Sequence, residues 1–154
     1  MSRKFVLCVG FCLLPTMAAV GAEPGVRTEF VGGTLSGIDA KSAARLDYSG
    51  AEEMVFHCAS GDIRVAYRKV NTLEYGQTVS RRYAAAVLLS PLLLLSKARK
   101  HFVTLGYVDA EGQQQVVVFR VEKGDIRSVL VGLEARTGRR VEYQDDEARK
   151  AGKG

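Results

Sequence analysis

Apolar residues alternate with polar ones along most of the central chain, which predicts a protein built mainly from β-strands. Strand-length runs of this kind lie at 28–35, 44–48, 54–58, 63–67 and 70–75. In the third run Met54, Phe56 and Cys58 fall on one face, because successive side chains of a strand point to opposite sides. Gly32 and Gly33 interrupt the first run, and this pair favours a β-bulge or a close approach of two backbones.

The clearest local pattern is a hairpin near the end of the chain. Runs at 101–108 and 115–121 flank the turn residues 109–112, and Gly112 supplies the positive φ that a short hairpin loop needs. We expect each strand to contribute three residues to one core layer: Val103, Leu105 and Tyr107 from the first, and Val117, Phe119 and Val121 from the second.

The stretch after this hairpin has the pattern of an amphipathic helix. Its apolar stripe consists of Ile126, Val129, Leu130 and Leu133. Asp125 is positioned to cap the first turn with its carboxylate, and Gly138 is positioned to end the helix in the left-handed conformation. After Tyr143 the residues are mostly charged and the chain ends in glycine, so we expect a flexible tail over 144–154.

The N-terminus has the three parts of a secretory signal. A basic start at Arg3 and Lys4 precedes an apolar run over 5–20, and small residues end at Ala22. We therefore expect residues 1–22 to be a signal peptide cleaved after Ala22, and the protein to be exported to the periplasm or cell envelope. Retention of this segment as an anchor is the alternative.

Cleavage would leave 132 of the 154 residues and only Cys58 of the three cysteines. A single thiol excludes an internal disulfide and a four-cysteine zinc site. With 47% apolar and 25% charged residues, the composition is that of an ordinary globular protein. A chain of roughly 130 residues can bury about two-thirds of its surface on folding. We therefore expect a single domain over 23–143 that is held together by its core.

Short strands followed by an amphipathic helix resemble a pleckstrin-homology-like (PH-like) domain. The stretch Ile63–Gly76 is similar to a strand pair of bacterial PH-like and GRAM-like domains, and 100–133 resembles their closing hairpin and helix. The resemblance implies an α+β fold, in which a bent antiparallel sheet or partial barrel of about seven strands is capped by one C-terminal helix. It also implies lipid or protein binding rather than catalysis. Phosphoinositide-binding members carry several basic residues between their first two strands, but 36–43 offers only Lys41, so that recognition is not carried over.

The most informative segment is an apolar insertion within 81–100. Arg81 and Arg82 precede the apolar run 83–95, which only Ser90 and Pro91 interrupt. A helix of this length reaches roughly 20 Å, short of the ~30 Å hydrocarbon core, and Pro91 would kink or end it. A full membrane span is therefore disfavoured. Three interpretations remain: a helical insertion packed on the domain's own sheet, a segment in the bilayer interface, or a protein-docking patch.

Charge favours a role for this segment at a surface. From Arg64 to Lys100 there are eight Lys or Arg residues against one acid, Glu74, a net charge of +7, whereas the rest of the exported chain carries −4. This asymmetry favours attachment to an anionic membrane surface, with an envelope protein as the alternative partner. We expect the contact to involve Arg81, Arg82, Val87, Leu88, Leu92, Leu93, Leu94, Lys97, Arg99 and Lys100.

Residues that could support catalysis are few. The exported chain has two histidines, and His57 is followed by Cys58 on a strand, so their side chains are expected on opposite faces. Cys58 is expected in the core and His101 at the start of an exposed strand. The sequence contains no metalloprotease, serine-hydrolase, helix-turn-helix or zinc-finger motif. We therefore expect a non-enzymatic binding module without a cofactor, a metal or a nucleic-acid partner, and its oligomeric state stays open.

Overall fold

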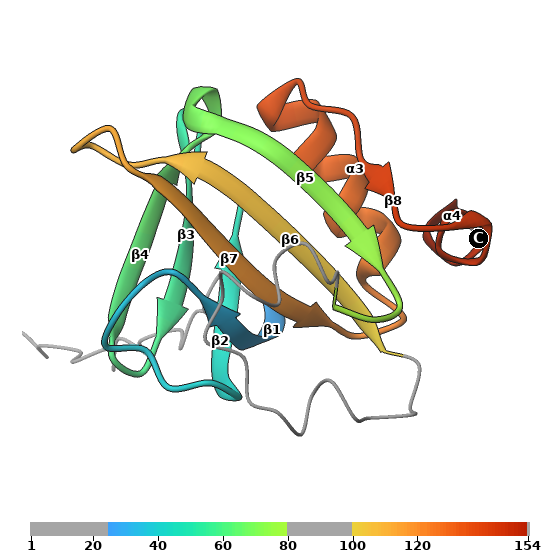
Figure 1. Cartoon of the computed structure of the whole chain (residues 1–154), viewed down its shortest axis with the longest axis horizontal. Coiled ribbons are helices and arrows are strands. Elements are labelled where there is room, and N and C mark those ends of the chain that lie inside the picture. Colours follow the sequence, from blue (N-terminus) through green and yellow to red (C-terminus); the bar gives the residue numbers. More distant parts are fainter. Residues whose placement is uncertain (1–24, 80–99, 154) are drawn as a thin grey trace, which may run out of the picture.

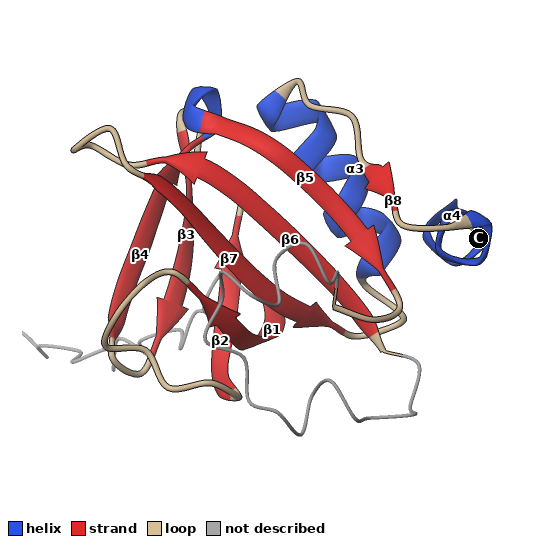
Figure 2. Cartoon of the chain, in the orientation of Figure 1, coloured by secondary structure: helices blue, strands red, loops and turns tan. Residues whose placement is uncertain are grey.

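The computed structural model describes residues 25–79 and 100–153, which form one β-sheet and two α-helices (Figures 1 and 2). The strands are β1 (Val26–Gly33), β2 (Ser42–Asp47), β3 (Glu53–Cys58), β4 (Gly61–Ala66), β5 (Val70–Gly76), β6 (His101–Val108), β7 (Gln114–Val121) and β8 (Glu142–Tyr143). The short 3-10 helix η1 (Tyr67–Lys69) joins β4 to β5, and helices α3 (Ile126–Thr137) and α4 (Asp146–Lys153) follow β7. The α+β class expected from the sequence is confirmed.

Two antiparallel meanders, β1–β4 and β5–β7, are joined by the pairing of β1 with β7. The strand order is β4-β3-β2-β1-β7-β6-β5-β8, and only the β5–β8 pair is parallel. Figure 1 shows β3 and β4 running across the direction of β5, β6 and β7, with α3 behind the second group of strands. One continuous sheet therefore supplies both walls of the core that α3 covers.

The glycine pair in β1 has the role that the sequence predicts. The register between β1 and β7 shifts between Phe30 and Gly32, which is a β-bulge. At Gly33 the two backbones are so close that an added Cβ would lie 2.5 Å from the carbonyl oxygen of Val116. The next residue, Thr34, donates its backbone N–H to the same oxygen at 3.0 Å. Both a bulge and a close backbone approach are thus confirmed.

The predicted hairpin is also confirmed. Val103 lies opposite Phe119, and Leu105 lies opposite Val117. Gly112 has a φ of +81° in the turn, as expected. All six residues of the expected layer are at most 5% exposed and belong to one hydrophobic cluster: Val103, Leu105, Tyr107, Val117, Phe119 and Val121.

The apolar stripe of α3 closes this cluster. Its four residues are at most 2% exposed: Ile126, Val129, Leu130 and Leu133. At the other end Gly138 has a φ of +67° and donates its N–H to the carbonyl of Glu134, so the expected left-handed cap is confirmed.

The expected side-chain cap at the start of α3 is wrong. Asp125 does occupy the capping position, but its carboxylate makes no capping hydrogen bond. Its backbone is already close to helical, with φ −102° and ψ −14°, whereas a capping side chain needs an extended backbone to reach back to the free amides. Asp125 acts instead through its carbonyl, which accepts from the N–H of Val129 and the hydroxyl of Ser128.

The C-terminal residues differ from the expected flexible tail over 144–154. The described residues there include helix α4, and β8 adds a short parallel strand beside β5. Ala148 of α4 is fully buried, and an added Cβ on Gly152 would lie 2.8 Å from the Tyr143 ring. The residues of α4 that pack on the core are small (Ala148, Ala151 and Gly152), so the sequence has no large apolar stripe that would predict this helix. The described chain thus holds eight strands and two α-helices where about seven strands and one C-terminal helix were expected.

Replacing Gly33 tests the closure between β1 and β7. We expect Gly33→Ala to lower the free energy of unfolding by about 1–3 kcal/mol, because its Cβ would collide with the Val116 carbonyl. Urea denaturation followed by circular dichroism measures this change. The matched control is Gly124→Ala, whose Cβ would meet nothing within 4 Å and should change stability by less than about 1 kcal/mol. Equal stability of the two variants would contradict the prediction.

Candidate functional site

The candidate segment 81–100 lies in the connection between β5 and β6, two neighbouring strands of the sheet, and we call this connection the excursion. Gly76, the last residue of β5, pairs with Phe102 near the start of β6. Just beyond this pair, Lys100 donates its backbone N–H to the carbonyl of Gln77 at 3.4 Å. Both ends of the excursion therefore lie at a single hairpin end, which we call its root.

Of the ten expected contact residues, the structure places only Lys100, which is half-buried and directly precedes β6. The other nine lie outside the described residues: Arg81, Arg82, Val87, Leu88, Leu92, Leu93, Leu94, Lys97 and Arg99. Their expected role in membrane or partner binding stays a prediction. The expected signal peptide, residues 1–22, also lies outside the described residues.

A buried tyrosine–histidine contact stands at the root. The hydroxyl of Tyr75 lies 2.5 Å from Nδ1 of His101, and the two rings stack nearly parallel with centroids 6.0 Å apart. Burial raises the pKa of Tyr75 to about 12, with smaller contributions from Tyr143 and Asp145. Burial, and then the charge of Lys123, lowers the pKa of His101. His101 does begin a strand as expected, but it is partly buried rather than exposed.

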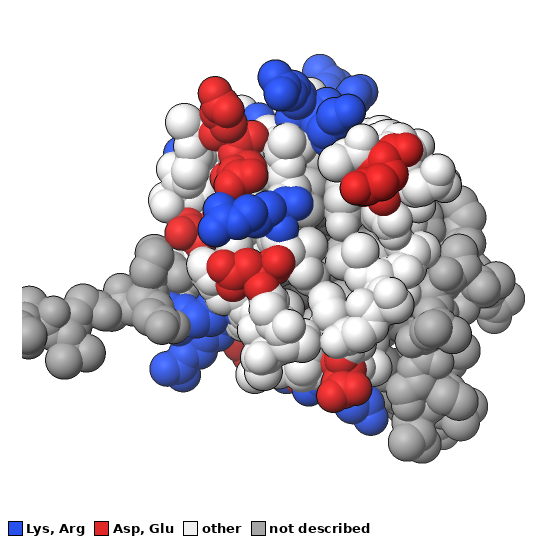
Figure 3. All heavy atoms as spheres, turned by 90° about the vertical axis from the view of Figure 1, so that its left-hand side faces the viewer, with Lys and Arg blue, Asp and Glu red and all other residues white. Residues whose placement is uncertain are grey.

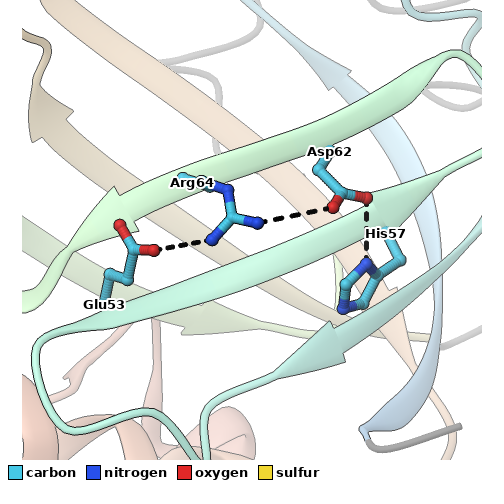
Figure 4. Close-up of polar contacts among 4 residues, drawn as sticks. All are labelled: Glu53, His57, Asp62 and Arg64. Atoms are coloured by element: carbon cyan, nitrogen blue, oxygen red, sulfur yellow. Dashed lines mark hydrogen bonds and ion pairs between the residues drawn. The ribbon is translucent and has the colours of Figure 1, made fainter.

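The outer face of β3 and β4, away from the α3-covered core, carries a chain of charged side chains (Figure 4). Arg64 bonds Glu53 at 2.8 Å and approaches Asp62 at 3.9 Å, and Asp62 in turn lies 2.9 Å from Nδ1 of His57. These side chains are between 39% and 60% exposed, so water screens each pair and the pairs add little to stability. Figure 3 shows acidic and basic groups interspersed over this face, as on an ordinary solvated surface.

His57 and Cys58 lie on opposite faces of β3, as expected. His57 points outward to Asp62, whereas Cys58 packs against the core cluster. Burial raises the pKa of the Cys58 thiol, which weakens it as a nucleophile. A hollow of about 720 Å³ is lined by His57 together with Thr28, Cys58 and two arginines, Arg27 and Arg45. Within the described part of the chain the side-chain partner of His57 is Asp62, and no hydroxyl or thiol is hydrogen-bonded to its ring.

A second apolar cluster lies on the outer face of the other half of the sheet. Its members are at most 9% exposed: Val31, Val79, Phe102, Val116 and Val118. Phe102 and Val118 alternate along their strands with residues of the α3-covered core, so this outer cluster faces away from α3. The signal in the sequence was the unbroken apolar run 116–119, which is typical of a strand buried on both faces. Val79 and Phe102 place the cluster at the root of the excursion.

Two polar residues are buried on the same face. Glu74 and Thr104 are each 2% exposed and lie opposite one another on β5 and β6. The side chain of Gln144 donates to Glu74 at 2.9 Å, which links the segment before α4 to this face. Glu74, the one acid in the basic stretch of the sequence, is therefore part of the packed structure rather than of the charged surface.

No family model matches the chain, and no curated protein matches it at a significant level. Over 25–79 and 100–153, no helix is both long and apolar enough to cross a membrane. Over the same residues, no group of three or more His, Cys, Asp or Glu side chains is arranged to hold a metal ion.

The lowered pKa of His101 predicts how stability depends on pH. The unfolded chain binds a proton on this residue near its ordinary pKa of 6.5, and the folded chain binds it only at lower pH. The stabilising contribution is therefore present above about pH 6.5 and is lost as the pH falls through the folded pKa. We expect the urea midpoint of the wild type to decrease when the pH is lowered from 7.5 to 5. The decrease should be smaller in His101→Gln. His57→Gln is the matched control, and its urea midpoint should still show the decrease that His101 causes. An equal decrease of the midpoint in His101→Gln and in the wild type would contradict the prediction.

Proposed function

We propose that this protein is an exported, non-enzymatic binding module that attaches to an anionic membrane surface through residues 81–100. The observation that supports this most is the root. Both ends of the excursion are held by one strand pair of a well-packed domain, so an apolar segment with basic flanks is presented from one place. Residues 77–100 contain five Lys or Arg and no acid.

We propose further that the domain is of the PH-like type. The strand order β4-β3-β2-β1-β7-β6-β5, built from two antiparallel meanders, supports this assignment. A helix that follows the seventh strand and packs on the core supports it as well. Domains of this type bind lipids and proteins through their loops, which agrees with a binding role for an excursion between two strands.

Two physical contributions would combine at the membrane. Side chains such as Leu88, Leu92 and Leu93 contribute up to about 1.5–3 kcal/mol each if they are fully removed from water. Each flanking cation contributes about 1 kcal/mol against an anionic leaflet, and salt screens that part. Neither part alone gives stable attachment, so binding should require the apolar run and the anionic lipid together.

The outer apolar cluster supports a second candidate function. This apolar sheet face at the root is buried, with members at most 9% exposed, and it is a surface on which the domain's own apolar segment could pack. In that case the protein is an interaction domain, and the cations around the segment serve solubility or partner choice.

Sedimentation with lipid vesicles tests the membrane proposal. We expect residues 23–154 to bind phosphatidylglycerol vesicles, to bind phosphatidylcholine vesicles weakly, and to lose affinity as salt rises. Leu93→Asp and the pair Arg81→Glu/Arg82→Glu should each weaken binding at least about tenfold, because each removes more than 1.4 kcal/mol of favourable interaction. Two matched controls should bind as the wild type does: Val131→Asp, at an apolar residue of α3 that is 60% exposed, and Arg149→Glu/Lys150→Glu on α4.

The same variants separate the two candidates. If the segment lies in the bilayer interface, Leu93→Asp leaves the free energy of unfolding in solution unchanged. If the segment packs on the outer apolar cluster, the same change lowers that free energy by about 2–5 kcal/mol. A folded protein that binds neither kind of vesicle would contradict the membrane proposal.

A further inference from the structure

Five cations gather at the end of the domain opposite the root. We call this group the basic cap; its members are all exposed: Arg68, Lys69, Arg136, Arg139 and Arg140. Arg68 and Lys69 belong to η1, Arg136 lies in the last turn of α3, and Arg139 and Arg140 follow its cap residue Gly138. Figure 3 shows a group of basic side chains at the top of the molecule, where Figure 1 places η1 and this end of α3.

Tertiary contacts bring the two segments together. The guanidinium of Arg136 lies over the ring of Tyr67, 5.9 Å from its centroid, and donates to the carbonyl of Ser49 at 3.2 Å. Arg139 donates through Nε to the carbonyl of Val70 at 3.1 Å. These contacts hold the end of α3 beside Arg68 and Lys69, because those two residues lie between the contacted Tyr67 and Val70 in the sequence.

The charge of the cap is not neutralised by ion pairs. None of its five members forms a salt bridge with a residue in the described part of the chain. Of the nearby acids, Glu53 bonds Arg64, and Glu134 accepts the backbone N–H of Val141. Attraction to the negative end of the α3 dipole accounts for a cation at Arg136, but not for two more on η1. Two acids, Glu52 and Glu53, line a hollow together with Arg68 and Arg136. Five exposed cations therefore stand beside two acids with which they form no ion pair, and the net charge of this end of the domain is positive.

The chemistry of the cap indicates its partner. Four of the five cations are arginines, whose planar fork matches phosphate oxygens. Protein-binding surfaces centre on exposed aromatic or apolar anchors, but Val131 is the one large apolar side chain that is exposed among the described residues. An extended anionic surface of phosphate groups therefore fits the cap better than a protein does.

We propose that the basic cap contacts an anionic lipid bilayer, so that one molecule holds two such bilayers. This inference rests on the proposed function, because residues 81–100 supply the other contact. β5 runs from the cap to the root, since Lys69 immediately precedes it and the excursion follows it. At about 3.3 Å per residue this strand separates the cap from the root by roughly 20 Å.

Clustering of vesicles tests this inference. Phosphatidylglycerol vesicles carrying a donor lipid dye are mixed with vesicles carrying an acceptor dye, and energy transfer and particle size are followed as the protein (residues 23–154) is added. We expect the wild type to cluster the vesicles. The variant Arg68→Gln/Lys69→Gln/Arg140→Gln leaves the packing contacts of Arg136 and Arg139 in place. It should still sediment with vesicles but cluster them at least fivefold less.

A matched variant, Lys123→Gln/Arg149→Gln/Lys150→Gln, removes the same charge elsewhere and should cluster vesicles as the wild type does. Undiminished clustering by the cap variant, or binding of the wild type without clustering, overturns the inference while the proposed function stands. If binding survives Leu93→Asp and Arg81→Glu/Arg82→Glu but is lost in the cap variant, the cap is a membrane contact and the proposed function fails. Absence of any binding overturns both.

Discussion

The pairing of β1 with β7 is the interaction on which the rest of the structure depends. It joins residues far apart in the sequence, such as Thr28 with Val121, and turns two separate meanders into one sheet. Only then can Phe56 of β3 meet Phe119 of β7, with ring centroids 5.1 Å apart, in a core that α3 covers. A pairing of such high contact order costs much loop-closure entropy, so the packing that it permits has to offset that cost. The close backbone approach at Gly33 leaves no room for a side chain at this point of the pairing.

The bulge in the same strand helps to determine what each face of the sheet presents. Phe30 belongs to the core under α3, whereas the next residue, Val31, belongs to the outer apolar cluster. The outer face therefore has two parts: an exposed charged surface over β3 and β4, and a buried apolar surface over β6 and β7. The two ends of the excursion lie beside the apolar part. This position is the reason that our proposal weighs both the membrane and the domain's own sheet as partners for its apolar residues.

Two groups of cations arise in different ways, one from the sequence and one from the fold. The basic flanks of 81–100 are neighbours in the sequence, and their charge depends on no fold. The basic cap depends on the tertiary structure, because the packing of α3 and the bonds of Arg136 and Arg139 to Ser49 and Val70 bring the end of α3 to η1. Because β5 runs from the cap to the root, a single strand separates the basic cap from the point where the basic segment joins the domain. Our proposal that one molecule contacts two anionic surfaces rests on this separation.

The sequence by itself determined the local elements whose signals are local. Alternating apolar residues located β1–β7 to within a few residues, Gly112 located the hairpin turn, and the stripe from Ile126 to Leu133 located α3, because period and turn chemistry act over short distances. The tertiary structure alone decided the closure of β1 on β7, the packing of α4 and the convergence of the basic cap. Each of these depends on which distant residues become neighbours. Helix α4 has too few apolar residues for the sequence to predict it, and it is stabilised by the packing of Gly152 against Tyr143 and Tyr75.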